Sequence, residues 1–335
     1  MNILLTSVGR RTYMINYFKE ALQGKGLVHA ANSVETYAMK LADKSVLSPL
    51  IYDGNYIDFL LDYCLKNNIK AVISLFDIDL PVLSKNKQIF VENDITVIVS
   101  DFNFIQICND KWLTYGFLIK NGFYAPVSFL SVNDALRAIE NKVINFPLIV
   151  KPRWGMGSIG IYEADNKEEL SVLYQKTLKS IKNSYLKYES NQEFNKSVII
   201  QEKLSGDEYG LDIFNNLNGE LLTCVPKKKL AMRAGETDSA EIIENKKLFG
   251  IGEKLSRLSK HIGNLDVDCF LVDNEFYILE MNCRFGGQYP FSHLAGVNFP
   301  QALIKMLMGE KVVDDLLHAK TGTIGIKDLV PIKLE

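Results

Sequence analysis

One stretch near the C-terminus, LDVDCFLVDNEFYILEMNCRFGG at residues 265–287, limits the folds open to this chain more than any other. Two apolar, strand-like runs flank a turn at residues 273–275, and side chains on one face of a strand recur at every second residue. Glu280 and Asn282 therefore point the same way, and a three-residue turn would place Asp268 directly opposite Glu280. The sequence predicts that three oxygen-bearing side chains converge on one face of an antiparallel hairpin.

These three side chains have the chemistry of a magnesium site. Two carboxylates as close as Asp268 and Glu280 repel each other unless a cation lies between them. Hard oxygen ligands favour Mg²⁺, which also binds nucleotide phosphates. Arg284 lies two residues beyond Asn282, where it can reach a phosphoryl group. A solvated face is the alternative, but the apolar runs VDCFLV and FYIL favour a buried hairpin.

The glycine-rich stretch VKPRWGMGSIG at residues 150–160 matches the pattern G-x-G-x-x-G and carries Lys151 ahead of its glycines. A Rossmann fingerprint needs a helix directly after the glycines, whereas the following IYEA alternates like a strand. A Walker A loop has its lysine at the end, and a kinase-type loop needs downstream H-R-D and D-F-G motifs that this sequence lacks. We expect a β-hairpin whose backbone N–H groups close over phosphates, with an ordinary loop as the alternative.

The first 105 residues alternate strand-like and helix-like segments, which predicts a parallel sheet with right-handed crossovers. We expect strands at residues 2–8, 70–76 and 95–100, and helices at 11–22, 57–68 and 80–93. Ligands on such sheets bind beyond the carboxyl ends of the strands. Two polar strand ends lie there, Ser7-Val8-Gly9-Arg10-Arg11 and Asp77-Ile78-Asp79, and ordinary turn chemistry is an equal alternative for each.

From about residue 106 onward, short strands linked by turn residues predict an α+β unit with antiparallel strands. Asn109 or Asp110 should cap a helix that Gly122 stops. Asp165 with Glu168 has the spacing of a capping box at the start of a long helix. Taken alone, the lysine cluster at residues 227–229 predicts a solvated strand edge.

Composition excludes several classes of function. The length of 335 residues predicts two or three packed units, and the net charge of −2 gives no strong field for nucleic acid or membrane. No run approaches the roughly 18 apolar residues of a membrane helix, and the N-terminus has the pattern of a buried strand rather than a signal peptide. The five cysteines are scattered and form no C-x-x-C pair, which favours a cytoplasmic protein without a zinc site or disulfides.

Taken in order, Lys111, Lys151 with its glycine loop, QEKLSGDEYG and then Asp268 with EMNCR resemble the motif set of the ATP-grasp superfamily. The set is most like one half of the carbamoyl-phosphate synthase large subunit, and it is similar to stand-alone carboxylate–amine ligases such as D-alanine–D-alanine ligase. The resemblance covers about residues 106–310. It implies an α/β pre-ATP-grasp domain with a Rossmann-like parallel sheet at 1–105, followed by an α+β ATP-grasp fold with antiparallel sheets. That fold would comprise a small lid subdomain with the glycine loop at 106–200 and a large subdomain with the magnesium-binding hairpin at 201–335.

The resemblance also implies a role for each matching residue. ATP phosphates would be bound by Lys111 and Lys151 and covered by Met156, Gly157, Ser158 and Gly160. The inter-domain segment that reads adenine through its backbone would be Gln201, Glu202, Lys203 and Leu204, and Glu208 would bind the ribose hydroxyls. Two Mg²⁺ ions, with Mn²⁺ as an alternative, would be held by Asp268, Glu280 and Asn282. Arg284 would steady the transferring phosphate, so that the catalytic set would be Arg284, Asn282 and Lys151.

The implied chemistry is attack of a small carboxylate on the γ-phosphate of ATP, giving an acyl phosphate and ADP, after which a nucleophile, usually an amine, displaces phosphate. Such a reaction needs positioning and charge neutralisation more than covalent catalysis. The partners would be the carboxylate and the nucleophile, and the resemblance is compatible with a homodimer. Because the chain has room for one grasp unit, phosphorylation of the carbamoyl-phosphate synthase type is only an alternative. A second alternative is a nucleotide-binding sensor or assembly subunit without turnover, and a biotin-carboxylase-like enzyme would need a biotinyl signal that is missing.

The sequence offers several residues that could hold the substrate. They are Arg10, Arg11, Asp77 and Asp79 at the strand ends of the first 105 residues, and Arg233 and Glu236 within KKKLAMRAGETDSA. Arg233 could face an acidic group and Glu236 an amino group, although a lid loop that forms ion pairs with itself explains both equally well. The RFGG stretch at 284–287 could present backbone N–H groups to a carboxylate or an acyl phosphate.

Overall fold

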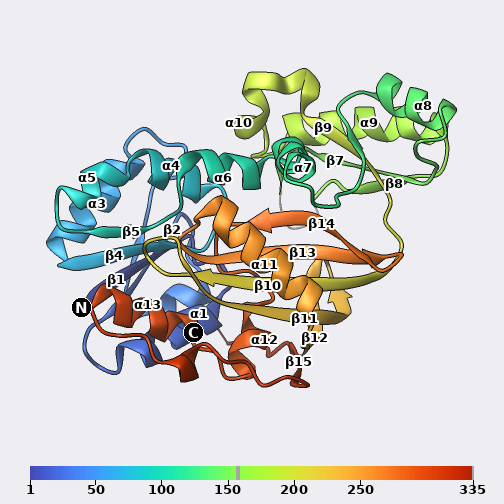
Figure 1. The fold of residues 1–335 in the computed structure, drawn as a ribbon. Coiled ribbons are helices and arrows are strands. Elements are labelled where there is room, and N and C mark those ends of the chain that lie inside the picture. Colours follow the sequence, from blue (N-terminus) through green and yellow to red (C-terminus); the bar gives the residue numbers. More distant parts are fainter. Residues whose placement is uncertain (156–158, 334–335) are drawn as a thin grey trace.

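The computed structural model describes residues 1–155 and 159–333. Its first sheet is parallel, with five strands in the order β3-β2-β1-β4-β5. The strands are β1 Asn2–Thr6, β2 Val28–Asn32, β3 Lys44–Leu47, β4 Ile69–Ser74 and β5 Thr96–Ile98. The helices that connect them are α1 Thr12–Leu22, α2 Tyr37–Leu41, α3 Tyr56–Lys66, α4 Asp79–Lys85 and α5 Lys87–Val91. In Figure 1, α3 and α5 lie on one side of this sheet and α1 on the other, so the predicted parallel sheet is confirmed.

Two strands of this sheet have no strong sequence signal. The edge strand β3 is mostly exposed, and the short β2 contains His29 and two alanines, so neither has the apolar run that marks a parallel strand buried on both faces. The helix that we predict at residues 80–93 is wrong as a single element. The chain forms α4 and α5 instead, and Asn86 ends the first and caps the second.

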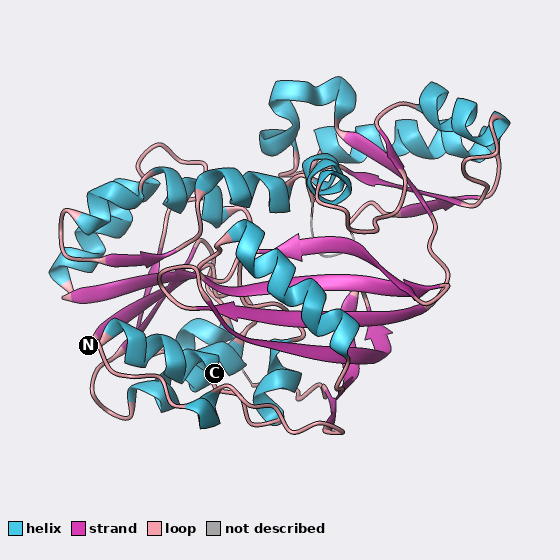
Figure 2. Ribbon diagram, in the orientation of Figure 1, coloured by secondary structure: helices cyan, strands magenta, loops and turns pink. Residues whose placement is uncertain are grey.

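The second sheet is antiparallel, with six strands in the order β14-β13-β10-β11-β12-β15. Its strands are β10 Asp207–Asn215, β11 Leu221–Arg233, β12 Glu236–Ile242, β13 Gly263–Val272, β14 Glu275–Asn282 and β15 Ile324–Ile326. Helix α11, Lys246–Ser259, crosses one face of the sheet (Figure 2). The short helices α12 Tyr289–Leu294 and α13 Phe299–Leu307 follow β14, and a 3-10 turn at Asp314–Leu316 leads to β15.

The segment at residues 227–240 forms the hairpin of β11 and β12 rather than a loop, although Arg233 pairs with Asp238 within it, as the lid-loop alternative expects. Ala234 and Gly235 make its turn with positive φ angles of 49° and 79°. The prediction of a solvated lysine cluster is wrong. Lys227 is fully buried against Asp212 and Lys229 is buried beside Asp268, so within the cluster only Lys228 is partly exposed.

The third sheet has four strands in the order β6-β9-β7-β8, seen at the upper right of Figure 1. Its strands are β6 Ser128–Phe129, β7 Leu148–Pro152, β8 Tyr162–Ala164 and β9 Val198–Glu202. They pack with α8 Val132–Glu140, α9 Lys167–Lys182, α10 Lys187–Ser190 and a 3-10 turn at Asn191–Lys196. Helix α9 begins one residue later than we predict, because Asn166 accepts from the N–H of Glu169, whose carboxylate accepts from the N–H of Asp165. Asn166 therefore caps the helix one position later than predicted, and the return bond of Glu169 reaches the N–H of Asp165 instead of that of the cap residue.

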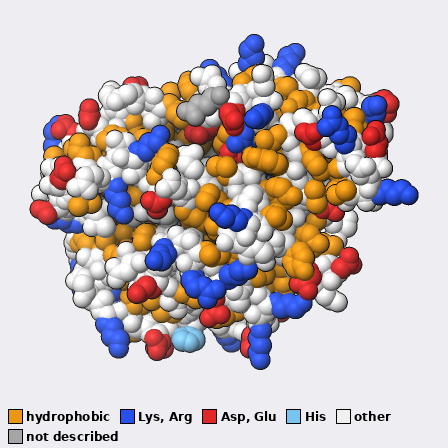
Figure 3. Space-filling view, turned by 45° about the horizontal axis from the view of Figure 1, so that its top comes forward, with side chains coloured by type: hydrophobic (Ala, Val, Ile, Leu, Met, Phe, Trp, Pro, Cys, Tyr) orange, Lys and Arg blue, Asp and Glu red, His pale blue; other side chains and the backbone are white. Residues whose placement is uncertain are grey.

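Two further helices, α6 Phe102–Asn109 and α7 Lys111–Lys120, join the parallel sheet to the rest of the chain. Buried apolar side chains of the parallel and six-stranded sheets belong to shared clusters, one of which unites Leu4 and Val72 with Val267 and Met281. The apolar cluster of the four-stranded sheet is confined to residues between 127 and 200. On the face seen in Figure 3, basic and acidic side chains are interspersed, in keeping with the small net charge.

Candidate functional site

A cavity of about 490 Å³ lies where the three sheets meet. Its volume is in the range of small-molecule sites. It brings together many of the residues that the sequence nominates. They are Arg11, Asp77, Lys111, Lys151, Glu208, Glu236, Asp268, Glu280, Asn282 and Arg284. Residues more than 270 positions apart in the sequence therefore share one chamber.

The hairpin of β13 and β14 places Asp268 opposite Glu280, as predicted, but by a different route. The turn has two residues rather than three, Asp273 and Asn274, with positive φ angles of 48° and 65°. That turn alone would pair Asp268 with Leu279. A bulge between the Asp268 and Cys269 positions shifts the register by one residue and restores the pairing with Glu280. The bulge therefore aims the oxygen-bearing face into the cavity.

The three oxygen donors of this face differ in their availability. Within the described residues, the side chains of Glu280 and Asn282 form no hydrogen bond or ion pair, so their oxygens are open to a ligand. Asp268 is engaged, because Lys229 Nζ lies 2.7 Å and Gln288 Nε2 3.1 Å from its Oδ1. Burial, together with the charges of Asp266 and Glu280, raises the pKa of Asp268 to about 6 despite the lysine. The donor set suits a hard cation that also has ligands from outside the chain.

Two lysines also line the cavity. Asp110 accepts from the N–H groups of Trp112 and Leu113 at the start of α7, which fixes Lys111 in the first turn. The same carboxylate binds Arg153 in bidentate fashion, with both N–O distances 2.7 Å. Because Arg153 follows Lys151 by two residues, the Asp110–Arg153 pair holds both lysines in place. Lys111 Nζ donates to the Gly155 carbonyl oxygen at 2.5 Å.

Lys151 is almost fully buried and, within the described residues, forms no hydrogen bond or ion pair. Burial lowers its pKa to about 7, and the charge of Lys111 adds to the effect, while Glu280 opposes it. A lysine held in this way lacks an anion, and a bound anion would restore its charge. The cavity is thus lined by two lysines and by two open oxygen donors.

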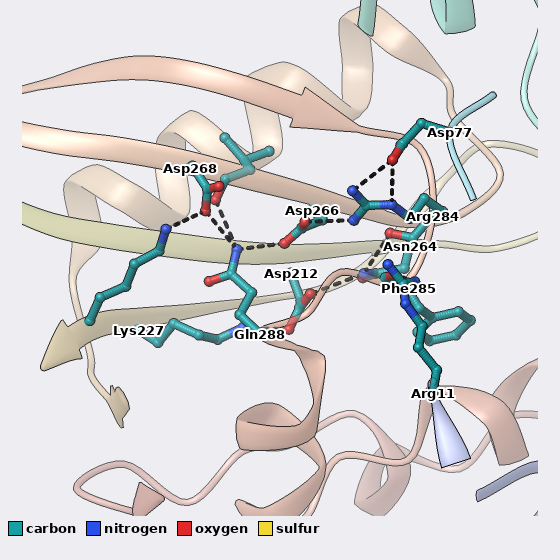
Figure 4. Close-up of polar contacts among 12 residues, drawn as sticks. Arg11, Asp77, Asp212, Lys227, Asn264, Asp266, Asp268, Arg284, Phe285 and Gln288 are labelled. Carbon is teal, nitrogen blue, oxygen red and sulfur yellow. Dashed lines mark hydrogen bonds and ion pairs between the residues drawn. The ribbon is translucent and has the colours of Figure 1, made fainter. Parts of the chain in front are cut away.

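A second group of charges lies toward the parallel sheet (Figure 4). The guanidinium of Arg284 donates to Asp77 Oδ2 at 2.8 and 3.0 Å and to Asp266 Oδ2 at 2.9 Å. These two carboxylates outweigh the effect of burial and raise the pKa of Arg284 above its ordinary value. Gln288 Nε2 donates to Asp266 Oδ1 at 2.5 Å and so links this group to Asp268.

Sequence reasoning missed Asp266, Lys229 and Gln288, although a signal existed for the first. Asp266 lies two residues before Asp268 and faces Asn282, so the period-two argument that selects Asp268 selects Asp266 as well. Lys229 could not be found in this way, because its acidic partners come from β10 and β13. Sequence reasoning also missed the apolar side chains that line the cavity, including Ile159, Ile161, Met232, Phe270 and Leu279.

The remaining nominated residues lie elsewhere. Arg10 is exposed and does not line the cavity, and Arg233 pairs with Asp238 and donates to the Lys327 carbonyl oxygen at 3.1 Å. Asp79 is fully buried and accepts from the hydroxyls of four residues, Thr6, Ser7, Tyr56 and Ser74. It therefore fastens the strand ends of the parallel sheet.

Five further nominated residues also lie outside the cavity lining, namely Gly160, Gln201, Glu202, Lys203 and Leu204. Met156, Gly157 and Ser158 lie outside the described residues.

Among the described residues, no group of three or more histidine, cysteine, aspartate or glutamate side chains could hold a metal ion. None of the described helices has both the length and the apolar character needed to cross a membrane.

Two family models match this chain. The model of the PylC-like N-terminal domain matches residues 3–98, and the model described as ATP-grasp in the biosynthetic pathway with Ter operon matches residues 194–325. Among curated proteins, the carbamoyl phosphate synthase large chain of Thermotoga petrophila is 23% identical over 276 residues, which are 78% of this chain and 24% of that protein. The D-alanine–D-alanine ligase of Petrotoga mobilis is 27% identical over 215 residues, 58% of this chain and 65% of the ligase.

Solved structures share the fold over almost the whole chain. The biotin carboxylase domain of 2-oxoglutarate carboxylase from Hydrogenobacter thermophilus, solved with MgADP and bicarbonate, has a TM-score of 0.71 and 16% identity, covering 93% of this chain and 70% of that one. The L-amino acid ligase from Bacillus licheniformis has a TM-score of 0.67 and 17% identity, covering 95% and 77%. The chain spans about a quarter of the length of the synthase large chains that it matches.

Proposed function

We propose that this chain, which joins a PylC-like N-terminal domain to an ATP-grasp fold, is an ATP- and Mg²⁺-dependent ligase. It would activate a small carboxylate as an acyl phosphate and transfer the acyl group to an amine or a related nucleophile, releasing ADP and phosphate. The relatives include enzymes named as ligases and synthases, and the fold of this chain matches that of an L-amino acid ligase.

One observation carries the proposal. Lys111 and Lys151 have no carboxylate partner within the described residues, and they share a cavity with Glu280 and Asn282, whose side chains are unengaged. An anion would pair with the two lysines. If that anion also carried a metal ion, the metal would bind the oxygens of Glu280 and Asn282. The polyphosphate of a nucleotide is such an anion.

The residues present fit magnesium. Glu280 and Asn282 offer open oxygens, and Asp268 has its Oδ2 free of the contacts that Lys229 and Gln288 make to Oδ1. These three side chains would hold the metal, with phosphate oxygens as the remaining ligands, since no described group of acidic residues completes a site by itself. When bound, magnesium would neutralise charge on the phosphate oxygens. We also propose that the site holds two metal ions and that it accepts Mn²⁺ in place of Mg²⁺.

The chain itself supplies position and charge. We propose that Lys111 and Lys151 bind the phosphates and that Lys229, beside Asp268, lies along the path of the transferring phosphoryl group. Arg284 uses three of the five N–H groups of its guanidinium on Asp77 and Asp266, which leaves two to steady that group. The substrate carboxylate would attack the γ-phosphorus, the bond to ADP would break, and the amine would then displace phosphate.

The nucleoside would lie beside Glu208. Glu208 lines the cavity and would bind the ribose hydroxyls, and the apolar side chains Ile159, Ile161 and Leu279 would contact the base. The backbone of residues 201–204 would reach the adenine edge from the end of β9. In the same proposal, residues 1–105, 106–200 and 201–335 act as three units around the nucleotide.

The setting of the protein is also a proposal. The five cysteines are free and buried, which supports a reducing, cytoplasmic environment.

Two other functions use the same nucleotide site. Phosphorylation of carbamate or a similar small carboxylate is favoured by the match to the synthase large chain, although this chain spans only about a quarter of it. A nucleotide-binding subunit without turnover would also retain the lysines and the oxygen-rich face.

The experiment that separates these functions measures ADP release from Mg-ATP with a panel of carboxylic acids, amino acids and carbamate. Hydroxylamine is added to trap an acyl phosphate as its hydroxamate. A ligase gives ADP and a hydroxamate in the presence of one class of acid. A carbamate-specific enzyme responds to carbamate alone, and a binding subunit binds Mg-ATP in calorimetry without releasing ADP.

A further inference from the structure

One cation on the cavity wall has no counter-charge. Arg11 precedes α1, and its Nη1 donates to the Phe285 carbonyl oxygen at 2.6 Å. No carboxylate of the described residues lies within ion-pair distance of it, whereas the neighbouring Arg284 is held by Asp77 and Asp266. Withdrawing a guanidinium from water without an anion is costly. The cost is removed when an anionic ligand arrives.

The position of Arg11 distinguishes it from the lysines that face the phosphates. Burial and the charge of Arg284 lower the pKa of Arg11, while Tyr13, Asp77 and Asp266 oppose them. The charges that act on Lys151 are those of Lys111 and Glu280. Lys151 comes from β7 of the four-stranded sheet and Arg11 from the segment between β1 and α1, so the two cations enter the cavity from different sheets. In Figure 4, Arg11 and Asp268 lie at opposite sides of the charge network.

A second cation lies behind the end of the cavity at Arg11, outside the cavity lining, where it contacts the lining residue Glu236. Lys327 follows β15, and its Nζ lies 3.5 Å from the Glu236 carboxylate. Burial lowers the pKa of Lys327, Glu236 compensates in part, and the charge of Arg11 lowers it further. Gly287 lines the cavity between them, and a Cβ placed there would be 3.7 Å from both Lys327 Nζ and Glu236 Oε2. Arg11 lines the cavity and Lys327 does not. The Glu236 carboxylate is largely exposed, and Asp77 and Asp266 at this end are already paired with Arg284.

We propose that Arg11, with Lys327 beside it, binds a second acidic group of the substrate, so that the substrate is a small acid with two anionic groups. One carboxylate would meet the γ-phosphate, and the other would pair with Arg11 and stay chemically unchanged. This inference rests on the proposed ligase function. It assigns the N-terminal part of the chain to substrate selection, since Arg11 is its contribution to the cavity wall together with Phe76 and Asp77.

The test compares acids of equal length that differ in one carboxylate. ADP release and hydroxamate formation are measured with succinate against butanoate, glutarate against pentanoate, and aspartate and glutamate against their amides. We expect turnover with diacids and little with their single-acid partners. Arg11→Met should raise the KM of the active diacid by about tenfold or more, because a charge-assisted hydrogen bond is lost, and should leave the KM of ATP unchanged.

Two further variants make the result specific. Arg11→Lys keeps a cation and should recover part of the lost affinity, which a merely structural defect would not allow. Arg257→Met removes an exposed arginine from α11 and should behave as wild type. Equal turnover of the diacids and their single-acid partners would overturn the inference. So would an unchanged KM of the diacid in Arg11→Met.

If no acid supports ADP release, the ligase function fails, and the anion site is tested alone. Thermal melts are then recorded with succinate, glutarate and malonate at matched ionic strength. Stabilisation of the wild type and of Arg257→Met, but not of Arg11→Met, would support an anion site at Arg11. The absence of any stabilisation in the wild type would contradict it.

Discussion

Lys229 Nζ lies 2.7 Å from Asp268 Oδ1, so one of the three oxygen donors on the face of the β13–β14 hairpin already has a cationic partner. Burial alone would lower the pKa of Lys229, but the ion pair with Asp268 outweighs burial and raises it. Lys229 therefore stays protonated across the ordinary pH range. Within the pair, only the carboxyl group of Asp268 takes up a proton.

This relationship gives a prediction for metal binding. The pKa of Asp268 is raised to about 6, and a metal ion binds only the carboxylate form, so the affinity for Mg²⁺ should weaken as the pH falls through about 6. Lys229→Met removes the charge that opposes this shift and should move the loss to higher pH. Titrations of Mg²⁺ against ATP binding between about pH 5 and 8 measure both midpoints. A metal dependence that is flat across this window in both proteins would remove Asp268 from the metal site.

Lys151 predicts proton uptake on nucleotide binding. Its pKa is lowered to about 7, so near neutral pH a large share of the free protein carries it uncharged. A bound phosphate favours the charged form, and the protein should therefore take up a proton, most strongly between about pH 7 and 9. Calorimetry of Mg-ATP binding in two buffers of different ionisation enthalpy measures this uptake, and ATP affinity should fall as the pH rises through the window.

The variants for this measurement are Lys151→Met and Lys120→Met. The first should abolish the uptake and weaken binding, whereas the second alters an exposed lysine at the end of α7 and should do neither. In the unliganded protein, the same shift makes the lysine a cost to stability at low pH, and that cost is relieved as the pH rises from about 7 toward the ordinary pKa of lysine. Equal buffer dependence in the wild type and Lys151→Met would contradict the assignment.

Gly286 is predicted to be sterically required. A Cβ at this position would lie 2.1 Å from Asp266 Cγ, and the carboxylate cannot move aside without leaving Arg284 and Gln288. Gly286→Ala should cost about 1–3 kcal/mol in the free energy of unfolding, since the clash forces a shift in a packed site. Gly250→Ala is the matched control, because its Cβ meets nothing within 4 Å in helix α11, and it should stabilise the protein by up to about 1 kcal/mol. Equal effects of the two changes on denaturant unfolding would refute the steric argument.

The sequence predicts the parts of this fold that depend on local periodicity. The parallel sheet and the pairing of Asp268 with Glu280 are examples, since each follows from alternation along neighbouring segments. The structure reaches that pairing by a different route from the predicted one. The turn is one residue shorter than expected and the bulge adds one residue back, so the two errors cancel.

What the sequence could not predict depends on partners far apart in the chain. Lys227 and Lys229 have the sequence character of a solvated edge, and they are buried because Asp212 and Asp268 arrive from other strands. Arg284 pairs with Asp77, which follows a strand of the parallel sheet, and with Asp266 of the hairpin. Likewise, nothing in the local pattern separates Arg10 from Arg11, and only the fold turns one toward solvent and the other into the cavity.

The most direct measurement of the central claim is Mg-ATP binding and ADP release by Glu280→Gln. Glu280 is the carboxylate of the site without a hydrogen bond or ion pair among the described residues, so the change removes a charge and breaks no contact. Glu275→Gln, near the start of the same strand, loses only a surface pair with Lys247 and is the control. The account predicts that both variants melt as wild type does without ligand. With Mg-ATP, only Glu280→Gln should lose turnover and the stabilisation that the nucleotide gives. Near-normal ADP release by Glu280→Gln, with its dependence on Mg²⁺ unchanged, would contradict the proposed site.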